Sequence, residues 1–167
     1  MSTTMLMTFA EFEQLPDEPG KRELIDGEVI ESPPPRLNHS RISQWFFELL
    51  RTVLPASRVL HEGGYRIGGG WLQPDASVMQ PDQKVENGYA IGSPMLAIEV
   101  LSPSNTALQI DRKLALYFEE GAREVWVVNP KRRSMTVYRN TERIVVEVSY
   151  AAELFGITVD LTQMPVD

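Results

Sequence analysis

One short apolar run constrains the fold of this chain more than any other feature. Within residues 123–129, the segment Val125-Trp-Val-Val128 carries no polar side chain. Successive side chains of a strand point to opposite faces, so an unbroken run of this kind is expected of a strand that is covered on both faces. The run therefore predicts a sheet with packed layers on its two sides.

Two segments have the periodicity of amphipathic helices that can cover such a sheet. The first spans roughly residues 39–54, with Asn38 as its expected N-cap and Pro55 at its end. The second spans about residues 106–120 and is followed by Gly121, which suits a C-terminal cap. Their apolar stripes comprise Ile42, Trp45, Phe46, Leu49, Leu50 and Val53 in the first helix and Ile110, Leu114, Tyr117 and Phe118 in the second.

Strands are predicted around these helices. Asp26-Gly27 between apolar pairs indicates a tight hairpin over residues 23–30, because glycine accepts the positive φ of such a turn. Before it, Thr8 and Glu11 form a capping-box pattern for one or two helical turns. The remaining strand-like runs cover residues 58–67, 71–79, 95–101, 134–139 and 143–149, and the polar stretch 81–92 is expected to be a loop.

The order of these elements is hairpin, helix, three strands, helix, strand and antiparallel tail. It predicts a mixed α/β domain in which helices flank a central mixed β-sheet, with an N-terminal β-hairpin. A length of 167 residues is that of one domain, so residues 1–167 are expected to form a single unit. We divide it into an N-terminal helix and hairpin (1–35), a core (36–143) and a C-terminal strand and tail (144–167).

Composition excludes several classes of protein. The chain has no cysteine, which excludes a disulfide framework and a zinc site built on thiolates. Its first residues lack the basic start and long apolar run of a signal peptide, and no apolar run approaches the ~20 residues of a membrane span. We therefore expect a cytoplasmic protein.

Two carboxylates and a lysine are the main candidates for chemistry. Asp75 lies in the predicted strand 71–79, and Glu99 is the one charge in the apolar strand 95–101. Buried carboxylates on neighbouring strands repel each other unless a divalent cation such as Mg²⁺, or Mn²⁺ as its substitute, lies between them. Such an ion can polarise a phosphoryl oxygen and activate water. Lys113, beside the apolar stripe of its helix, can reach the pair and position the attacking water or stabilise transition-state charge.

Each of these three residues also has a structural interpretation. Lys113 can be a surface lysine whose stem covers apolar groups. Glu99 can face water from an edge strand, and Asp75 can stand in a turn or at the end of a strand. Spacing alone leaves these alternatives open.

The candidate motifs occur in an order that resembles a known family. Glu23-Leu-Ile-Asp-Gly-Glu28 is followed by His39, Pro74-Asp75, Ile98-Glu99-Val-Leu-Ser-Pro-Ser104, Lys113 with Tyr117, and Gly121-Ala-Arg-Glu-Val-Trp-Val-Val-Asn-Pro130. This order resembles the Uma-type family of restriction endonucleases, which is abundant in cyanobacteria and belongs to the PD-(D/E)XK nuclease superfamily. The resemblance covers about residues 20–140, and Glu-Val-Leu-Ser-Pro-Ser is its most specific motif.

The resemblance implies a restriction-endonuclease-like core, which matches the element order above. It places Asp75 in the PD half-motif and Glu99 at the acidic position of the second half. The superfamily's usual lysine comes two residues after that acid, where this chain has Leu101. In the family the lysine lies on the next helix, at the position of Lys113. An aspartate that is frequent four residues before this lysine is replaced by Gln109.

Further candidates are weaker. Glu23 matches a family glutamate before the Asp-Gly turn and is either an acidic site residue or a strand-end surface charge. His39 falls on the stripe side of its helix, where it can contact a phosphate, orient a water or make a hydrogen bond of the first helical turn. Glu62 can face the site from the strand 58–67. Lys131 opens a basic turn that can touch a phosphate backbone.

Together these residues predict a Mg²⁺-dependent endonuclease that hydrolyses phosphodiester bonds in DNA. Asp75 and Glu99 hold the metal, Lys113 orients or activates the water, and Glu23 and His39 assist. The alternative is a nuclease-fold protein that no longer cuts and serves as a DNA-binding or oligomeric interaction module. By analogy with the family a homodimer is expected, since two active sites suit double-strand cutting.

The distribution of charge bears on the expected DNA substrate. The net charge is -7, which by itself argues against a general nucleic-acid binder. However, residues 1–35 carry -6 and residues 144–167 carry -4, whereas residues 36–143, with 14 bases and 11 acids, carry +3. The acidity lies at the two ends of the chain, so it predicts weak, salt-sensitive DNA binding and does not exclude it.

Overall fold

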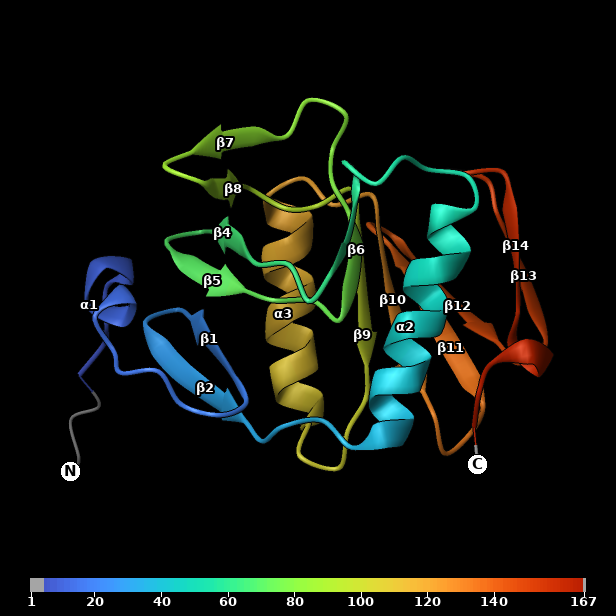
Figure 1. The fold of residues 1–167 in the computed structure, drawn as a ribbon, viewed down its shortest axis with the longest axis horizontal. Coiled ribbons are helices and arrows are strands. Elements are labelled where there is room, and N and C mark those ends of the chain that lie inside the picture. Colours follow the sequence, from blue (N-terminus) through green and yellow to red (C-terminus); the bar gives the residue numbers. More distant parts are fainter. Residues whose placement is uncertain (1–4, 167) are drawn as a thin grey trace.

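The computed structural model, which describes residues 5–166, contains two six-stranded sheets, a two-stranded sheet and three α-helices (Figure 1). Residues 1–4 and 167, which the predicted domain also includes, lie outside the described residues. In the described range no helix is both long enough and apolar enough to cross a membrane. The mixed α/β class expected from the sequence is confirmed.

The central sheet has the strand order β12-β11-β10-β9-β6-β3. Strands β9 and β10 run parallel and all other neighbours run antiparallel, so the sheet is mixed, as predicted. The apolar run 125–128 lies in β10, the third strand from one edge, and is buried. The strands of the central sheet are β3 (Val59–His61), β6 (Ala76–Val78), β9 (Leu96–Val100), β10 (Glu124–Asn129), β11 (Ser134–Arg139) and β12 (Glu142–Val146).

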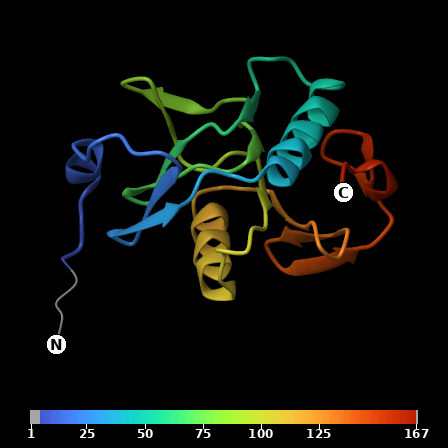
Figure 2. The ribbon, with the colours of Figure 1, turned by 60° about the horizontal axis from the view of Figure 1, so that its bottom comes forward.

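Two helices cover opposite faces of this sheet (Figure 2). Helix α2 (Leu37–Arg51) buries Ile42, Phe46 and Leu50 against one face, together with the side chains of Ile98 and Val100. Helix α3 (Ala107–Glu119) packs in a second cluster on the other face, which contains Ala97, Val125 and Val127. The period-two alternation of β9 therefore separates the two cores, as expected for a strand that is covered on both faces.

The cap predicted for the first long helix is wrong. Asn38 lies inside α2, and the N-cap is Arg36, which provides no side-chain hydrogen bond. The helix begins earlier because Arg36 is extended directly after Pro33–Pro35 and the helical turn follows at once. At the end of α3, Gly121 has a φ of 110°, the left-handed conformation expected of a C-terminal glycine.

The predicted N-terminal hairpin is present and belongs to the other six-stranded sheet, which we call the first sheet because it contains β1. Asp26 and Gly27 form its turn with φ angles of 50° and 80°. The sheet order is β2-β1-β5-β4-β8-β7, and its last two strands come from the stretch 81–92 that was predicted to be a loop. Its strands are β1 (Lys21–Ile25), β2 (Glu28–Ser32), β4 (Tyr65–Ile67), β5 (Gly70–Leu72), β7 (Lys84–Glu86) and β8 (Tyr89–Ile91), and α1 (Phe9–Glu13), with the predicted capping box of Thr8 and Glu11, precedes them.

Two strands predicted as continuous each divide between the two sheets. The run 58–67 is broken at Glu62, which has a φ of 55°, and the run 71–79 is broken between Gln73 and Asp75. A side chain at Gly64 would lie 1.8 Å from the Trp71 ring, so only glycine permits this crossing. The paired chains therefore pass from the first sheet into the central sheet, and Asp75 lies at the crossing point, directly before β6 and not inside it.

The C-terminal part forms an antiparallel tail, as predicted, with one hairpin more than expected. The run 143–149 ends as β12 at Val146. A hairpin of β13 (Ser149–Ala152) and β14 (Ile157–Asp160) and a short 3₁₀-helix (Leu161–Gln163) follow. Tyr150 and Val159 of this hairpin complete the core cluster on the α2 side.

Candidate functional site

The two predicted metal-binding carboxylates lie on neighbouring chains of the central sheet. Strands β6 and β9 pair antiparallel with Ala76 opposite Ile98, and the Asp75 backbone N–H donates to the Ile98 carbonyl over 3.0 Å. Asp75 and Glu99 are therefore brought to the same place, and they are only 4% and 5% exposed. The alternative of an edge-strand carboxylate facing water does not hold for Glu99. Asp75 does stand at the end of a strand, directly before β6, but it is buried.

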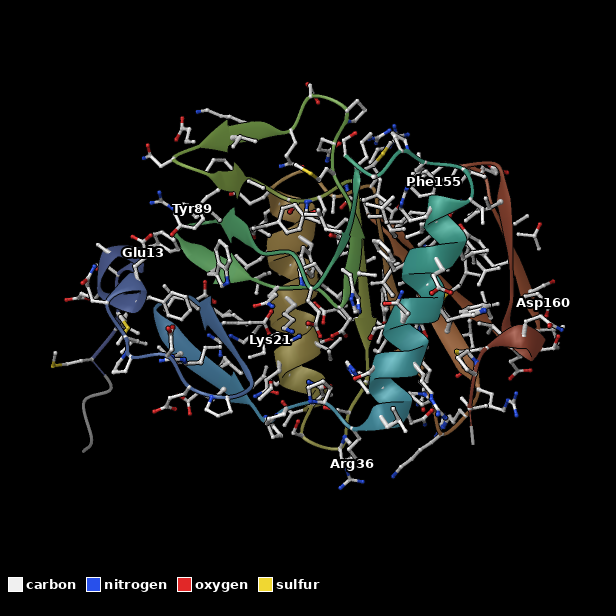
Figure 3. The ribbon with its side chains drawn as sticks, viewed as in Figure 1. Glu13, Lys21, Arg36, Tyr89, Phe155 and Asp160 are labelled. Carbon is white, nitrogen blue, oxygen red and sulfur yellow. The ribbon has the colours of Figure 1, made fainter. Side chains whose placement is uncertain are left out.

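Both carboxylates line a cavity of about 990 Å³. The cavity lies between the start of the first sheet, the N-terminus of α2 and the loops that follow β9 and β10. Its polar lining includes Lys21, Arg36, Asn38, His39, Glu62, Gln73, Ser102, Ser104, Asn105, Asn129 and Lys131, together with the backbone of Val100 and the apolar Leu101. Figure 3 labels two of the lining residues, Lys21 on β1 and Arg36 at the start of α2.

Behind Glu99 the predicted lysine joins two acids. The Lys113 ammonium lies 2.6 Å from Glu23 Oε1 and 3.3 Å from Glu99 Oε2. Tyr117, one turn further along α3, donates its hydroxyl to Glu99 Oε1 over 2.7 Å. Glu23 also accepts the Gln73 backbone N–H over 2.8 Å. All four ionisable side chains are nearly inaccessible to solvent, so Lys113 is not a surface lysine and Glu23 is not a surface charge.

Asp75 has a different set of partners, on the side of the cavity. Its Oδ2 accepts the Val100 backbone N–H over 2.7 Å and lies 3.4 Å from His39 Nε2. The same His39 nitrogen lies 3.0 Å from the Val100 carbonyl oxygen. The Lys21 ammonium lies 3.5 Å from Asp75 Oδ1 and donates to the Gln73 carbonyl over 3.0 Å.

The electrostatic environment separates the two carboxylates. Burial tends to raise the pKa of Asp75, but the Lys21 ammonium and the His39 and Val100 hydrogen bonds outweigh it and lower that pKa to about 2. For Glu99, burial dominates and raises the pKa, although Lys113 and Lys21 act in the opposite direction. One carboxyl is thus held firmly ionised, while its neighbour binds protons more readily.

The pKa values of the three basic groups in the site are raised. Burial lowers the pKa of Lys113 and of Lys21, but the facing acids outweigh burial and raise both above the ordinary lysine value. The pKa of His39 is raised in the same way, since Asp75 outweighs the effect of burial. Burial and the adjacent Glu99 raise the pKa of Tyr117 well above its usual value, so its hydroxyl remains a donor.

The donor set suits a hard divalent cation. No three His, Asp or Glu side chains within residues 5–166 gather closely enough to hold an ion by themselves. Asp75 and Glu99 supply carboxylate oxygens on paired chains that line one cavity. Mg²⁺ takes one or two protein carboxylates and keeps several waters, which is what two carboxylates beside an open cavity can satisfy.

The structure thus brings together Glu23, His39, Asp75, Glu99 and Lys113, the five residues predicted for the site. Glu62 and Lys131, the weaker candidates, also line the cavity.

Sequence reasoning missed Lys21 and the polar role of Tyr117. The spacing of each residue in the sequence could have identified it. Lys21 stands two residues before Glu23 in a strand, and Tyr117 stands four residues after Lys113 in a helix, so each shares a face with a residue already chosen.

Comparison with known proteins agrees with this geometry. A model of the Uma2 family, described as "Putative restriction endonuclease", matches residues 9–163. A crystal structure from Anabaena variabilis, described as a "putative nuclease", superposes with a TM-score of 0.82 at 24% sequence identity and covers 95% of this chain and 97% of that chain. At that identity the similarity establishes the fold alone. No curated protein matches the chain.

Proposed function

The chain belongs to the Uma2 family, and on that premise we propose that it is a metal-dependent endonuclease that hydrolyses phosphodiester bonds in DNA. One observation supports this proposal above all others. Two buried carboxylates, Asp75 and Glu99, come from paired chains of the central sheet and line one cavity of about 990 Å³. Burying two carboxylates in the same site is unfavourable unless cations bind there and compensate their charge.

In this proposal Asp75 and Glu99 hold a Mg²⁺ ion, for which Mn²⁺ substitutes. When bound there, the ion would supply Lewis-acid stabilisation of the phosphoryl charge and would lower the pKa of an attacking water. His39 and the Val100 N–H fix the Asp75 carboxylate, and Lys113 and Tyr117 fix the Glu99 carboxylate. Precise placement of both acids is what allows them to act on the same phosphate.

The hydrolysis consumes one water for each bond cut. The water oxygen bonds to phosphorus as the bond from phosphorus to the leaving sugar oxygen breaks. One water proton ends on the leaving oxygen, and the other remains with the new phosphomonoester or passes to solvent.

The rim of the cavity supports a nucleic-acid substrate. Arg36 at the start of α2 and Lys131 after β10 line the same cavity as the two acids. They belong to the segment 36–143, which carries a net charge of +3 in an otherwise acidic chain. Because so few cations are available for phosphates, binding is expected to be weak and to fall steeply with salt.

The test is cleavage of supercoiled plasmid DNA with Mg²⁺ or Mn²⁺. Wild-type protein is expected to nick and linearise the plasmid, and Asp75→Asn and Glu99→Gln are expected to abolish cleavage. Glu124→Gln is the matched control, because Glu124 is a buried carboxylate on the adjacent strand β10 that lies outside the cavity lining. Equal cleavage by wild type, Asp75→Asn and Glu99→Gln contradicts the proposed site.

A second candidate function is a nuclease-fold protein that binds DNA without cutting it. It is favoured by Leu101, which stands where the superfamily's usual lysine would be and lines the cavity as an apolar residue. Calorimetric titration with Mn²⁺ separates the two functions. Tight binding that Asp75→Asn removes supports the nuclease, whereas no Mn²⁺ binding together with DNA binding supports the alternative.

The proposed endonuclease acts as a homodimer, so that two sites can cut the two strands. Sedimentation equilibrium of the free protein tests this part of the proposal separately, with a mass of twice 18.9 kDa as the expected result.

A further inference from the structure

The site contains two lysines whose access to the cavity differs. The Lys21 side chain is 22% exposed and lines the cavity beside Asp75 and Glu99. The Lys113 side chain is 5% exposed, and among the described residues it is not part of the cavity lining. A phosphate that enters the cavity therefore meets the Lys21 ammonium before it can meet that of Lys113.

The contacts of the two ammonium groups also differ. Lys113 lies between two carboxylates, 2.6 Å from Glu23 and 3.3 Å from Glu99, and both acids are buried with it. The described contacts of Lys21 use two of the three ammonium N–H donors, and the one to Asp75 is long, at 3.5 Å. Lys21 can thus turn a donor toward a ligand in the cavity without leaving a buried carboxylate unpaired.

We propose that Lys21 is a catalytic residue that contacts the scissile phosphate, and that Lys113 is a positioning residue that acts through Glu99. This inference rests on the proposed nuclease function and deepens it. Lys21 donates to a non-bridging oxygen of the phosphate and stabilises the negative charge that grows there as water adds to phosphorus. No covalent bond to Lys21 forms and no proton leaves it.

The position of Lys21 explains how the site tolerates Leu101. Leu101 follows Glu99 by two residues and brings an apolar side chain to the cavity. The missing cation arrives from strand β1, which carries Lys21 and Glu23 on the same face because they are two residues apart. The N-terminal hairpin, which supplies Lys21, is then a working part of the site and not an accessory to the core.

The first experiment compares rates of cleavage under single-turnover conditions at saturating Mn²⁺. Lys21→Met is expected to lower the rate constant about 10²- to 10³-fold, the range found when one donor to a developing oxyanion is removed. Lys21→Arg keeps the charge and is expected to recover part of the loss. The matched control is Lys84→Met, which removes a lysine from β7 at the far edge of the first sheet and is expected to cleave like wild type.

The second experiment measures binding without any metal or turnover. Anisotropy of a labelled 20-base-pair duplex in EDTA gives the dependence of the dissociation constant on salt. Each phosphate contact contributes about 0.9 to the slope of log K against log[salt] for duplex DNA. Lys21→Met is expected to lower that slope by about 0.9, whereas Lys84→Met, which changes the net charge equally, is expected to leave it unchanged.

If Lys21 only neutralises the charge of Asp75, a different result is expected. The slope of Lys21→Met then equals that of wild type, and its cleavage at saturating Mn²⁺ stays within threefold of wild type. Either outcome overturns the role given to Lys21. Thermal unfolding of each variant verifies that the protein is folded. If Lys21→Met does not fold, Lys21→Arg is compared with wild type in both experiments instead. Absence of cleavage by wild type overturns the nuclease function instead, while the salt slope still tests the phosphate contact.

Discussion

Buried carboxylates gather in two clusters of the molecule, and the surroundings of these clusters differ. The open cluster consists of Lys21, Glu23, Asp75, Glu99 and Lys113 and adjoins the cavity. The closed cluster is centred on Glu124, whose oxygens accept hydrogen bonds from Trp126, Arg139 and Tyr150 near the C-terminal hairpin.

Burial alone does not distinguish the two clusters. Glu124 is 3% exposed, much like Asp75 and Glu99. The difference is that Glu124 collects three donors, each within 3.1 Å, and lies outside the cavity lining. In the open cluster two acids line a cavity, and Lys113 is shared between two carboxylates. A buried charge marks a site of chemistry when ligands can reach it, and otherwise it ties structural elements together.

The largest effect expected from this comparison is on cleavage. Glu99→Gln removes a charge from the open cluster and is expected to lower the rate of plasmid cleavage at least about 10³-fold, equivalent to about 4 kcal/mol in the barrier. The loss is specific to catalysis, so chemical denaturation is expected to show nearly unchanged stability. If the variant were unfolded under assay conditions, the loss of cleavage would come from lost stability, and Glu99 would be a structural residue like Glu124.

The next effect is on stability and tests Lys113 as the centre of the open cluster. Lys113→Met leaves Glu23 and Glu99 buried without their shared cation and is expected to cost about 3 kcal/mol of unfolding free energy. Because the cost comes from unpaired charge, Glu23→Gln in the same chain is expected to restore part of it. A double-mutant cycle measured in urea gives this coupling. Strict additivity of the two substitutions would show that Lys113 does not join the two acids.

A smaller loss is expected when the closed cluster is broken. Glu124→Ala leaves the Trp126 and Tyr150 donors without their buried acceptor and is expected to cost about 2 kcal/mol. Urea denaturation measures the loss, and the plasmid assay at a temperature where the variant is folded is expected to give wild-type rates. Loss of cleavage in the folded variant would mean that the two clusters are coupled and that the contrast drawn between them is wrong.

The smallest effect concerns a sealed pair between the two sheets. The Tyr65 hydroxyl and Ser77 Oγ lie 2.8 Å apart, and burial raises the pKa of Tyr65 to about 12. Below pH 10 the tyrosine is protonated in the folded and the unfolded chain alike. Between pH 10 and about 12 only the unfolded chain releases the proton, so stability falls as pH rises.

This titration can be isolated by substitution. Relative to Tyr65→Phe, wild type is expected to lose about 1.4 kcal/mol of unfolding free energy between pH 9 and pH 11, since one pKa unit is worth 1.36 kcal/mol. The difference between the two unfolding curves, measured at each pH, cancels the other titrating groups. A difference that stays constant over this range would mean that solvent reaches the Tyr65 hydroxyl in the folded protein.

Most of the secondary structure was predictable because local patterns suffice for it. The stripes of α2 and α3, the Asp26-Gly27 turn and the alternation of β9 are properties of short segments. The predictions failed where a segment depends on a distant partner. Strands β7 and β8 are only three residues long each, and they are strands because they pair with each other and because β8 pairs with β4. The runs 58–67 and 71–79 looked continuous, yet each crosses between sheets.

The sequence by itself determined which chemistry is available: two acids in apolar strands, a lysine on a helix and the order of motifs that places the chain in its family. Tertiary structure decided which cation faces the cavity. Lys21 and Lys113 are separated by most of the chain, and spacing contains no information about which of them lies nearer solvent. That depends on how β1 pairs with β5 and how α3 packs on the central sheet, contacts between segments that lie far apart in the sequence.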